Sequence, residues 1–397
     1  MVVESQHIFC VCQPGAEAPL KGEVAARAPD LRFGFSRPGF VTFKLPEPTP
    51  IESIELLPFA FARTCGVSLG KVVDGETIGQ LARQVWELQS VVSLAQTGTI
   101  GGVHAWQRET KLPGVNGIEP GPTPLAEEVR AAVVAATPHE ASSSDRSDSD
   151  ELTDDQSKTD DQSKTDGQSK ADGQSKTDGQ SKTDFVLDIA IVETNKWWVG
   201  CHPLQTRVDR WPGGVPAIEL PEHAVSRAYL KMSEALRWSA MPTSPGDLWV
   251  ELGCAPGGAS QALLDAGMFV LGVDPAEVAK VVIRDERFAH LRGKAAEIRR
   301  KELNDARWLA ADISAAPEYT LDAVQSVVTH ADAHFRGLLL TLKLTDWSLA
   351  TPEKLDEYVN RIRGWGYRDV RLRQLAFNRQ ELCVAALRSR GQRRLRR

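Results

Sequence analysis

A glycine-rich turn in the second half of the chain has the residue types of a site for an anionic, nucleoside-like ligand. The turn follows an apolar segment, 248–252, and leads directly into a helical pattern. Its candidate binding residues are Gly253, Ala255, Pro256, Gly257 and Gly258. Glycine lets the backbone bend sharply and approach a ligand, and a helix N-terminus offers free N–H groups to a carboxylate or phosphate. The turn therefore predicts a cofactor site at the end of a strand.

The glycine spacing discriminates between cofactors. A dinucleotide-binding turn has the pattern G-x-G-x-x-G, whereas these glycines stand at positions 253, 257 and 258. A second apolar segment ends in Asp274, 21 residues after Gly253, where a carboxylate can accept hydrogen bonds from both hydroxyls of a ribose. Together these features favour S-adenosylmethionine over a nicotinamide cofactor.

A lysine within an apolar run is a second candidate for chemistry. Lys343 interrupts LLLTLKL at 338–344, and an unpaired ammonium in a buried strand is costly, so Lys343 needs a partner or a task. Three other polar residues are ambiguous when taken singly. Lys231 fits a solvated helix charge, Asp312 a helix N-cap, and Glu381 a surface ion pair.

Alternating helical and strand patterns from 221 to 389 must position these residues. Strands are predicted at 248–252, 269–273, 307–310, 337–342, 370–374 and 382–386. Helices are predicted at 225–237, 259–266 and 352–364. Strands separated by helices indicate an α/β fold with a parallel, Rossmann-like doubly wound sheet, in which the ligand lies at the carboxyl ends of the strands.

A low-complexity segment divides the first half of the chain. A hexapeptide, TDDQSK or TDGQSK with one variant, occurs five times between Thr153 and Lys182. The stretch 140–184 holds 13 acidic and 6 basic residues, and its only apolar residues are Ala141, Leu152 and Ala171. A β-helix needs a recurring apolar residue to fill its interior, so we expect a disordered acidic insert.

The segments on both sides of this insert predict one small α+β domain. Strands are predicted at 7–12, 185–193 and 196–202, a hairpin at 31–45, and helices at 16–28, 76–88 and 124–136. Trp197 and Trp198 are adjacent and would face opposite sides of a strand. We therefore expect at most one of these two indoles in the core, with the other on a surface or stacked on a base.

Composition excludes several classes of protein. The 397 residues are 42% hydrophobic and 25% charged, with no apolar run near the roughly 20 residues that span a bilayer. The N-terminus has no basic region typical of a secretory signal, which favours the cytoplasm. Six scattered cysteines, without a C-x-x-C pair or a Cys/His cluster at zinc spacing, predict buried thiols and no metal site.

The charge is unevenly distributed. Without 140–184 the net charge changes from −6 to about +1, and 12 arginines but only two acids follow position 360. A basic end of this kind suits a polyanion such as RNA, although a solubilising tail is the alternative.

The motifs together resemble the FtsJ-like ribose 2'-O-methyltransferases. The blocks SRAYLKMSEAL, ELGCAPGGASQ, LGVDP, AADISAAP, LLLTLKL and FNRQELCVAAL carry the resemblance. The step from Asp312 to Pro317 and the N-terminal FCVCQPGAEAPLKGEVA are similar to the RlmM-type branch, which methylates 23S rRNA cytidine. This resemblance implies a THUMP-like N-terminal domain that binds RNA.

The resemblance also implies a catalytic tetrad of Lys231, Asp312, Lys343 and Glu381. Lys343 would accept the proton of the ribose hydroxyl, Lys231 and Glu381 would orient the ribose, and Asp312 would lie near the methyl group and contact the cofactor. Glu251 departs from the family pattern, which has aspartate there, so the methionine end of the cofactor could be held differently. The family's acid after the third strand, which contacts adenine, has no counterpart in 290–296.

We expect a methyltransferase that uses S-adenosylmethionine to modify a ribose 2'-hydroxyl of large-subunit rRNA. The alternatives are another RNA such as tRNA, a non-catalytic RNA-binding assembly factor, or a small-molecule methyltransferase. No membrane or DNA partner is expected. The predicted division is 1–138 for the first part of the N-terminal domain, 139–184 for the insert, 185–220 for the end of that domain and a connector, 221–389 for the methyltransferase domain and 390–397 for a basic tail.

Overall fold

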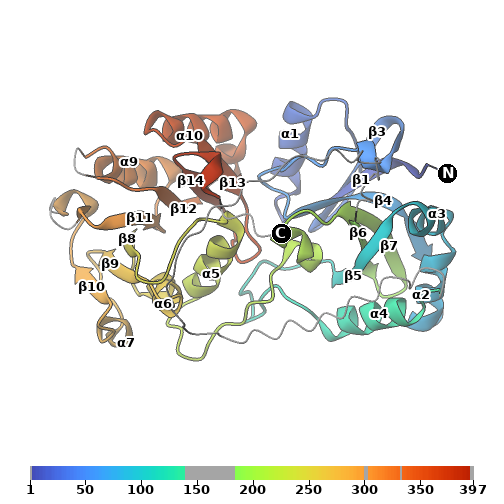
Figure 1. Cartoon of the computed structure of the whole chain (residues 1–397), viewed down its shortest axis with the longest axis horizontal. Helices are drawn as coiled ribbons and strands as arrows, with labels where there is room; N and C mark the ends of the chain where they lie inside the picture. The colour runs from blue at the N-terminus through green and yellow to red at the C-terminus, as the bar shows by residue number, and fades with distance from the viewer. Residues whose placement is uncertain (1, 139–183, 299–302, 331–332, 394–397) are drawn as a thin grey trace, which may run out of the picture.

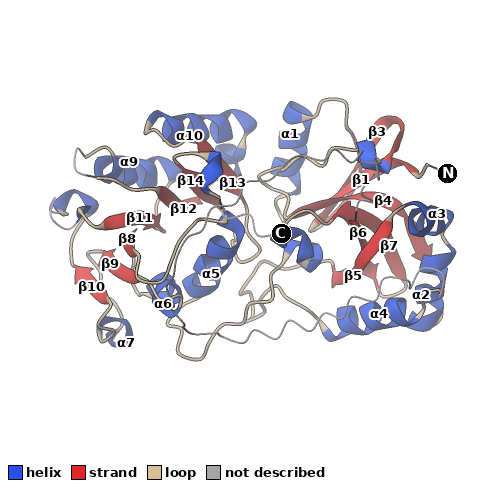
Figure 2. Cartoon of the chain, viewed as in Figure 1, coloured by secondary structure: helices blue, strands red, loops and turns tan. Residues whose placement is uncertain are grey.

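Two sheets with packed helices form the protein (Figures 1 and 2). The computed structural model describes residues 2–138, 184–298, 303–330 and 333–393. One sheet belongs to the N-terminal half, residues 2–203, and the other to the C-terminal half, residues 228–393. The predicted acidic insert falls on 139–183, outside the described residues.

Seven strands form the N-terminal sheet in the order β2-β3-β1-β4-β7-β6-β5. They are β1 (Glu4–Val11), β2 (Arg32–Arg37), β3 (Phe40–Pro50), β4 (Thr64–Val73), β5 (Thr99–Gln107), β6 (Asp184–Glu193) and β7 (Lys196–Pro203). All neighbouring strands are antiparallel except β5 and β6, which are parallel. Since β7 and β6 lie between β4 and β5, strands from both sides of 139–183 share one sheet.

Helices cover one face of this sheet. They are α1 (Glu17–Arg27), α2 (Ile78–Glu87), α3 (Gln89–Thr97) and α4 (Pro124–Ala135). Apolar residues four positions apart, such as Leu81 and Val85 in α2, lie on one side of the helix and are buried against the strands. The Thr77 side chain accepts a hydrogen bond from the Gln80 amide at the start of α2, which satisfies one of the free N–H groups.

The opposite face of the N-terminal sheet carries aromatic rings, and this overturns one expectation. Trp197 is fully buried against the helix-covered face, and Trp198 is only 8% exposed on the other face. The ring of Trp198 packs on Phe35 and Phe40, with centroids 6.4 and 5.5 Å away. The prediction that at most one of the two indoles is core was wrong, because neighbouring strands supply aromatic cover on both faces.

The C-terminal sheet also has seven strands, in the order β10-β9-β8-β11-β12-β14-β13. They are β8 (Leu248–Leu252), β9 (Phe269–Val273), β10 (Phe288–Leu291), β11 (Ala306–Ala311), β12 (Gly337–Lys343), β13 (Asp369–Arg373) and β14 (Glu381–Leu387). The ladders from β10 to β12 are parallel, whereas β14 is antiparallel to β12 and β13, because a short connection from β13 forces the chain to turn back. The predicted Rossmann-like α/β fold is confirmed, with this one reversed strand.

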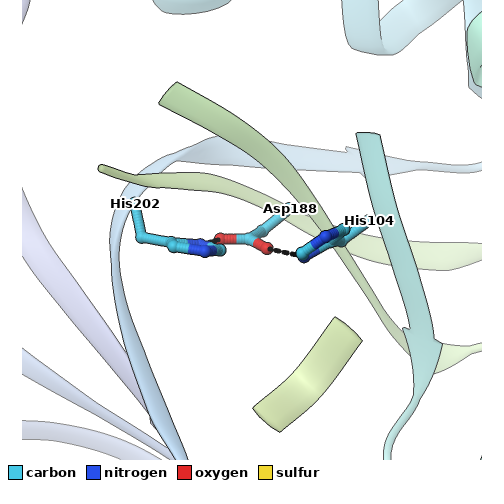
Figure 3. Close-up of side chains that lie close together, drawn as sticks. All are labelled: His104, Asp188 and His202. Carbon is cyan, nitrogen blue, oxygen red and sulfur yellow. Dashed lines mark hydrogen bonds and ion pairs between the residues drawn. The ribbon is translucent and has the colours of Figure 1, made fainter. Parts of the chain in front are cut away.

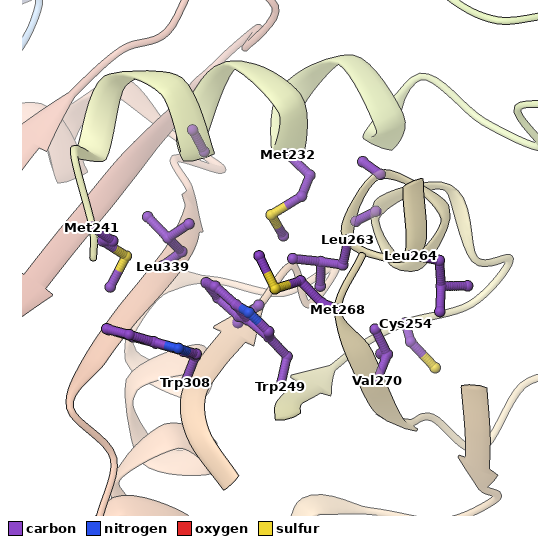
Figure 4. Packing of buried hydrophobic residues seen from close by; sticks show 14 of the residues in the cluster. Met232, Met241, Trp249, Cys254, Leu263, Leu264, Met268, Val270, Trp308 and Leu339 are labelled. Atoms are coloured by element: carbon purple, nitrogen blue, oxygen red, sulfur yellow. The ribbon is translucent and has the colours of Figure 1, made fainter. Parts of the chain in front are cut away.

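Helices lie on both faces of the C-terminal sheet. They are α5 (Ala228–Ser239), α6 (Gly258–Asp265), the short α7 (Lys280–Ile283), α9 (Pro317–Val328) and α10 (Pro352–Gly364). Under α5 and α6, the indoles of Trp249 and Trp308 stack with centroids 5.9 Å apart, and Met232 and Met268 lie beside them (Figure 4). This core fixes α5 and the turn before α6 against the strand ends.

The two halves contact each other through an apolar cluster. Phe61 is fully buried there together with Leu344 and Leu382 of the C-terminal half, and its ring centroid lies 6.3 Å from that of Trp347. The backbone N–H of Gln374 also donates to the Ala60 carbonyl oxygen at 2.7 Å. Burial of these rings holds the N-terminal sheet beside the last strands of the C-terminal sheet.

Most of the predicted helices and strands are present, and their ends lie within two or three residues of the predicted ends. Six of the described helices and strands had no prediction: β4, α3, β5, α7, β10 and α9. All six cysteines are free thiols; Cys65 is partly buried and the others are buried. Among the described residues, no helix has both the length and the apolar content that a membrane crossing requires.

Candidate active site

The glycine turn lies at the carboxyl end of β8, the strand beside β11 where the sheet's strand order reverses. Gly253 and Gly257 have φ values of 78° and 114°, which side chains other than glycine rarely adopt. A Cβ at Gly253 would come within 2.9 Å of the Asp312 carbonyl oxygen. The turn therefore brings the chain directly against the residue that follows β11, at the position where ligands bind in sheets of this type.

Asp274 follows β9, next to this turn. Its carboxylate accepts hydrogen bonds from the Ala255 amide at 3.1 Å and the Ala276 amide at 2.8 Å. These bonds tie the predicted ribose-binding acid to the predicted phosphate- or carboxylate-binding turn. Asp274 remains partly exposed, so its oxygens can also accept from a ligand.

Glu251, which departs from the family pattern, is buried. Its side chain accepts a hydrogen bond from the Ser260 hydroxyl at 2.5 Å, across from β8 to α6. Burial raises the pKa of Glu251 to about 8, and the nearby Asp312 and Asp274 carboxylates add to the rise. The carboxyl is therefore mostly protonated at pH 7 and serves to join the strand to the helix.

Four charged side chains from distant parts of the chain meet beside the turn. The ammonium nitrogen of Lys231, on α5, lies 2.6 Å from Asp312 Oδ2 and 3.4 Å from both oxygens of Glu381. Nζ of Lys343, at the end of β12, lies 3.7 Å from Asp312 Oδ1 and 4.0 Å from Glu381 Oε1. The register pairs Lys343 directly with Glu381 on β14. The two lysines and two carboxylates thus form one balanced cluster.

The two lysines of this cluster have different environments. Burial alone would lower the pKa of Lys231, but the adjacent Asp312 and Glu381 carboxylates raise it above its ordinary value. Lys231 therefore stays an ammonium. Lys343 is more open, with 26% of its side chain exposed against 13% for Lys231, and it donates to the Ser314 hydroxyl at 2.8 Å.

The cluster borders a small hollow of about 20 Å³ lined by Lys231, Asp312, Asn378 and the apolar ends of β11 and β12. Asp312 Oδ1 is buried and has no hydrogen-bond partner within the described part of the chain. A buried carboxylate oxygen in this state fits a cationic group or a donor on a bound molecule. Asp312 is not a helix N-cap, because α9 begins after Ala316.

The loop between β13 and β14 contains residues that sequence reasoning missed. Asn378 donates to Glu381 at 3.2 Å, and its own side-chain oxygen accepts from the Leu375 amide. The buried Gln13 of the N-terminal half donates from Nε2 to the carbonyl oxygens of Leu375, Ala376 and Asn378 at 2.6–3.1 Å. Gln13 and Asn378 stand in two of the family-like motif blocks, which was the available signal, but their contacts depend on the tertiary structure.

Glu234 holds the same loop from the other side. Its carboxylate, on α5, accepts hydrogen bonds from the Ala376 and Phe377 amides at 2.8 and 3.0 Å. Burial raises the pKa of Glu234 to about 7, although these two bonds oppose the rise. The loop that orients Glu381 is therefore fixed by both halves of the protein.

The arginines near the C-terminus are used differently from what was expected. Six of the nine described ones bond to other parts of the protein: Arg361, Arg371, Arg373, Arg379, Arg388 and Arg393. Most of the described C-terminal arginines therefore bond to other parts of the protein. Neutralising RNA phosphates is not a task that all of them share. Residues 394–397 lie outside the described part.

Comparison with known proteins identifies the C-terminal half. Residues 224–354 match the FtsJ-like methyltransferase family, which confirms the predicted resemblance for this part of the chain. A ribosomal RNA large subunit methyltransferase M from Alkalilimnicola ehrlichii is 36% identical over 113 residues, or 27% of this chain and 31% of that protein. The protein of the same name from Halorhodospira halophila is 29% identical over 185 residues, 45% of this chain and 51% of that protein.

These matches cover only part of each relative. The chain spans between about a third and half of the length of the relatives it matches. Aeropyrum pernix fibrillarin, solved with bound S-adenosyl-L-methionine, has 19% identity and a TM-score of 0.31 over 51% of this chain and 82% of that one, a likeness too low to support an argument. The sequence matches thus relate residues 224–354 to the FtsJ-like methyltransferases; this segment holds Lys231, Asp312 and Lys343, and Glu381 lies beyond it.

Proposed function

We propose that the protein is an S-adenosylmethionine-dependent methyltransferase that modifies a ribose 2'-hydroxyl of large-subunit rRNA. The observation that supports this most is the meeting of Lys231, Asp312, Lys343 and Glu381 beside the glycine turn. A small, balanced cluster of lysines and carboxylates at the strand ends is suited to hold a neutral hydroxyl and to take its proton.

In this proposal the residues of the chain have separate tasks. Lys343, the more open lysine, first gives up its own proton to solvent, and the neutral amine then accepts the proton that the ribose hydroxyl loses as its oxygen takes the methyl group. Lys231 stays positively charged and, with Glu381, orients the ribose. Asn378 and Gln13 keep Glu381 in place, acting as positioning residues.

The cofactor contacts belong to the turn and the strand ends. Gly253, Ala255, Pro256, Gly257 and Gly258 would hold the methionine end, and Asp274 the ribose hydroxyls. When bound, S-adenosylmethionine supplies the methyl group. Oδ1 of Asp312, which accepts no hydrogen bond from the described residues, fits the cationic end of this molecule.

RNA is the proposed substrate because the hydroxyl that accepts the methyl is the one that DNA lacks. The basic side chains that lie over the aromatic face of the N-terminal sheet suit the phosphates of an RNA strand. The Lys71 ammonium lies 4.1 Å from the centroid of the Trp198 ring, and the Arg37 guanidinium 4.8 Å from that of Phe35. Burial lowers the pKa of His7, and the positive charges of Lys44 and Lys71 lower it further because they lie nearby. Several basic groups are therefore close together on this face.

Basic groups neutralise phosphates, so we propose this half as the RNA-binding, THUMP-like domain. The proposed division keeps 1–138 and 185–220 as this domain, with 139–184 as its insert, followed by the methyltransferase domain at 221–389 and the tail at 390–397. The cytoplasm is the proposed location, as the compartment in which rRNA is modified.

A methylation assay with isotope-labelled S-adenosylmethionine tests the function. Large-subunit rRNA, small-subunit rRNA and tRNA from cells lacking the protein are offered separately and digested to nucleosides. We expect label in a 2'-O-methyl nucleoside of large-subunit rRNA. Label in tRNA would support the alternative substrate, label only in base-methylated products would reject ribose chemistry, and no label in any RNA would favour an assembly factor.

A further inference from the structure

A cluster of two histidines and an aspartate lies within the N-terminal sheet, outside the candidate active site (Figure 3). We propose that His104, Asp188 and His202 bind a divalent first-row transition metal ion such as Zn²⁺. One ligand atom from each residue lies within 4.8 Å of the other two. The proposal is independent of the proposed methyltransferase function.

The three side chains come from neighbouring strands and share one face of the sheet. His104 on β5 is paired with Asp188 on β6 in the parallel register. On β7, Gly200 is opposite Asp188, and His202, two residues further along, points to the same face. Figure 3 shows both rings turned towards the carboxylate between them. His202 Nδ1 lies 2.6 Å from Asp188 Oδ2, and His104 Nδ1 lies 3.8 Å from Asp188 Oδ1.

These distances are close to those of a metal site. Zn²⁺ binds imidazole nitrogen and carboxylate oxygen at about 2.0–2.2 Å, which puts tetrahedral ligand atoms roughly 3.3 Å apart. The two measured contacts, which end on different oxygens of Asp188, differ from this spacing by about 0.5–0.7 Å, and the spacing between the two histidines is at most 4.8 Å. Three protein ligands leave one position for water, as three-ligand zinc sites do.

The second nitrogen of His202 is held as in known metal sites. Its Nε2 donates to the carbonyl oxygen of Asp209 at 2.7 Å. A metal-binding histidine usually donates its other N–H to a carbonyl or carboxylate, which fixes the ring and its tautomer. The Asp209 carboxylate in turn accepts hydrogen bonds from Gln205 and Thr206, so the segment after β7 is ordered around the site.

A simple ion pair between His202 and Asp188 is the alternative, and it leaves His104 Nδ1 without a hydrogen bond in the described residues, at 3.8 Å from Asp188. The side chains of Asp188 and His202 are 3% and 6% exposed, and that of His104 is 13% exposed. His104 Nδ1 is buried with no hydrogen-bond partner in the part of the chain that the structure describes. A buried ring nitrogen without a donor or acceptor is costly unless something else occupies its lone pair, and a metal ion would do so.

The ligand set favours a metal of intermediate softness. Two imidazoles with one carboxylate suit Zn²⁺ and also Fe²⁺, Ni²⁺ or Cu²⁺, whereas Mg²⁺ and Ca²⁺ prefer oxygen ligands. Arg130 and Arg210 lie near enough to affect His104 electrostatically, and their positive charges oppose a cation. The site therefore depends on the ligands themselves and not on the surrounding charge.

Zn²⁺ titration of the full chain tests this proposal. The protein is purified without a histidine tag, stripped with EDTA, dialysed, and titrated with Zn²⁺ by calorimetry, with bound metal measured by mass spectrometry. We expect one Zn²⁺ per chain and a Tm higher by about 5 °C at a Zn²⁺ concentration about 100 times the Kd. X-ray absorption should show nitrogen and oxygen neighbours and no sulfur.

Variants distinguish a metal site from an ion pair and from zinc binding at the cysteine thiols. His104→Gln removes a ligand without breaking the ion pair, so it should fold with an unchanged metal-free Tm and bind Zn²⁺ at least about 100-fold more weakly. The matched control is His7→Gln, at an exposed position of the same sheet, which should bind as the wild type does. Failure to bind stoichiometric Zn²⁺ would leave only the ion pair, and equal uptake by His104→Gln, or loss of binding on thiol alkylation, would also overturn the proposal.

Discussion

In the C-terminal half, four charged side chains meet where parallel strands end, whereas in the N-terminal half three polar side chains meet within a sheet. The first cluster has two lysines and two carboxylates whose side chains are 13–26% exposed. The second has one carboxylate between two imidazoles, with side chains 3–13% exposed. The first cluster is therefore the more open of the two, mainly through Lys343.

The two clusters also differ in what holds them. Lys231, Asp312, Lys343 and Glu381 neutralise one another, and the loop before Glu381 is fixed by Gln13 from the other half. His202 is fixed by the backbone of the segment that follows its own strand. The candidate active site thus depends on a contact between the two halves, whereas the cluster of His104, Asp188 and His202 is held by residues of the N-terminal sheet and the segment that follows it.

The largest effect should come from Lys343→Ala. If this lysine takes the hydroxyl proton, transfer to rRNA should fall by about 10²–10⁴-fold while the Kd for S-adenosylmethionine changes little. Single-turnover transfer and calorimetry measure the two quantities. Lys354→Ala, at a surface lysine paired with Glu357, is the control and should keep full activity. Undiminished transfer by Lys343→Ala would count against the proton-acceptor role.

A second change addresses the aromatic face of the N-terminal half. Replacing Lys44, Lys71 and Lys196 by glutamine should weaken RNA binding uniformly across sequences. The slope of log affinity against log salt should become shallower by about 2, because each lost phosphate contact on single-stranded RNA removes about 0.7. Filter binding over a range of salt concentrations measures this. Unaltered affinity and slope would move the RNA surface elsewhere, and Zn²⁺ affinity should not change.

Gln13→Ala tests the contact between the halves. Loss of three hydrogen bonds to the loop before Glu381 should lower kcat about 10-fold, with the Kd for S-adenosylmethionine unchanged. Gln6→Ala, on β1 just before Gln13 in the chain, removes bonds to Leu45 and Pro46 and should leave kcat as it is. If Asn378 carries the effect, Gln13→Ala should cost much less in an Asn378→Ala background. An equal loss in both backgrounds would show that Gln13 acts independently of the Asn378 side chain.

The smallest expected effect concerns Glu251 and stability. In the folded protein burial keeps this carboxyl protonated up to a pKa of about 8, whereas the ordinary pKa of a glutamate is 4.5. The unfolded state loses the proton first, so the free energy of unfolding falls as pH rises from about 4.5 to 8. Glu251→Gln should therefore raise Tm by a few degrees at about pH 8.5 relative to the wild type, and not at about pH 5. The same Tm difference at both pH values would contradict the shifted pKa.

Sequence patterns predicted the elements that have continuous apolar runs and clear boundaries. Both β8 and β9 were placed correctly because an apolar run ends in a glycine turn or an aspartate. By contrast, β5 has two adjacent glycines and a histidine within it, and β4 contains Gly66 and Gly70, so neither has a regular alternation. Their strands form because neighbouring strands supply hydrogen bonds and cover, which local sequence does not reveal.

The sequence by itself determined the glycine turn, the acid after β9 and the four charged residues, because these motifs carry their structural context in neighbouring residues. Only the tertiary structure decided that Gln13 reaches the loop before Glu381, that most of the described C-terminal arginines serve internal contacts, and that His104, Asp188 and His202 meet. These contacts join residues up to 365 positions apart, and strand pairing and the packing between the two halves bring them together.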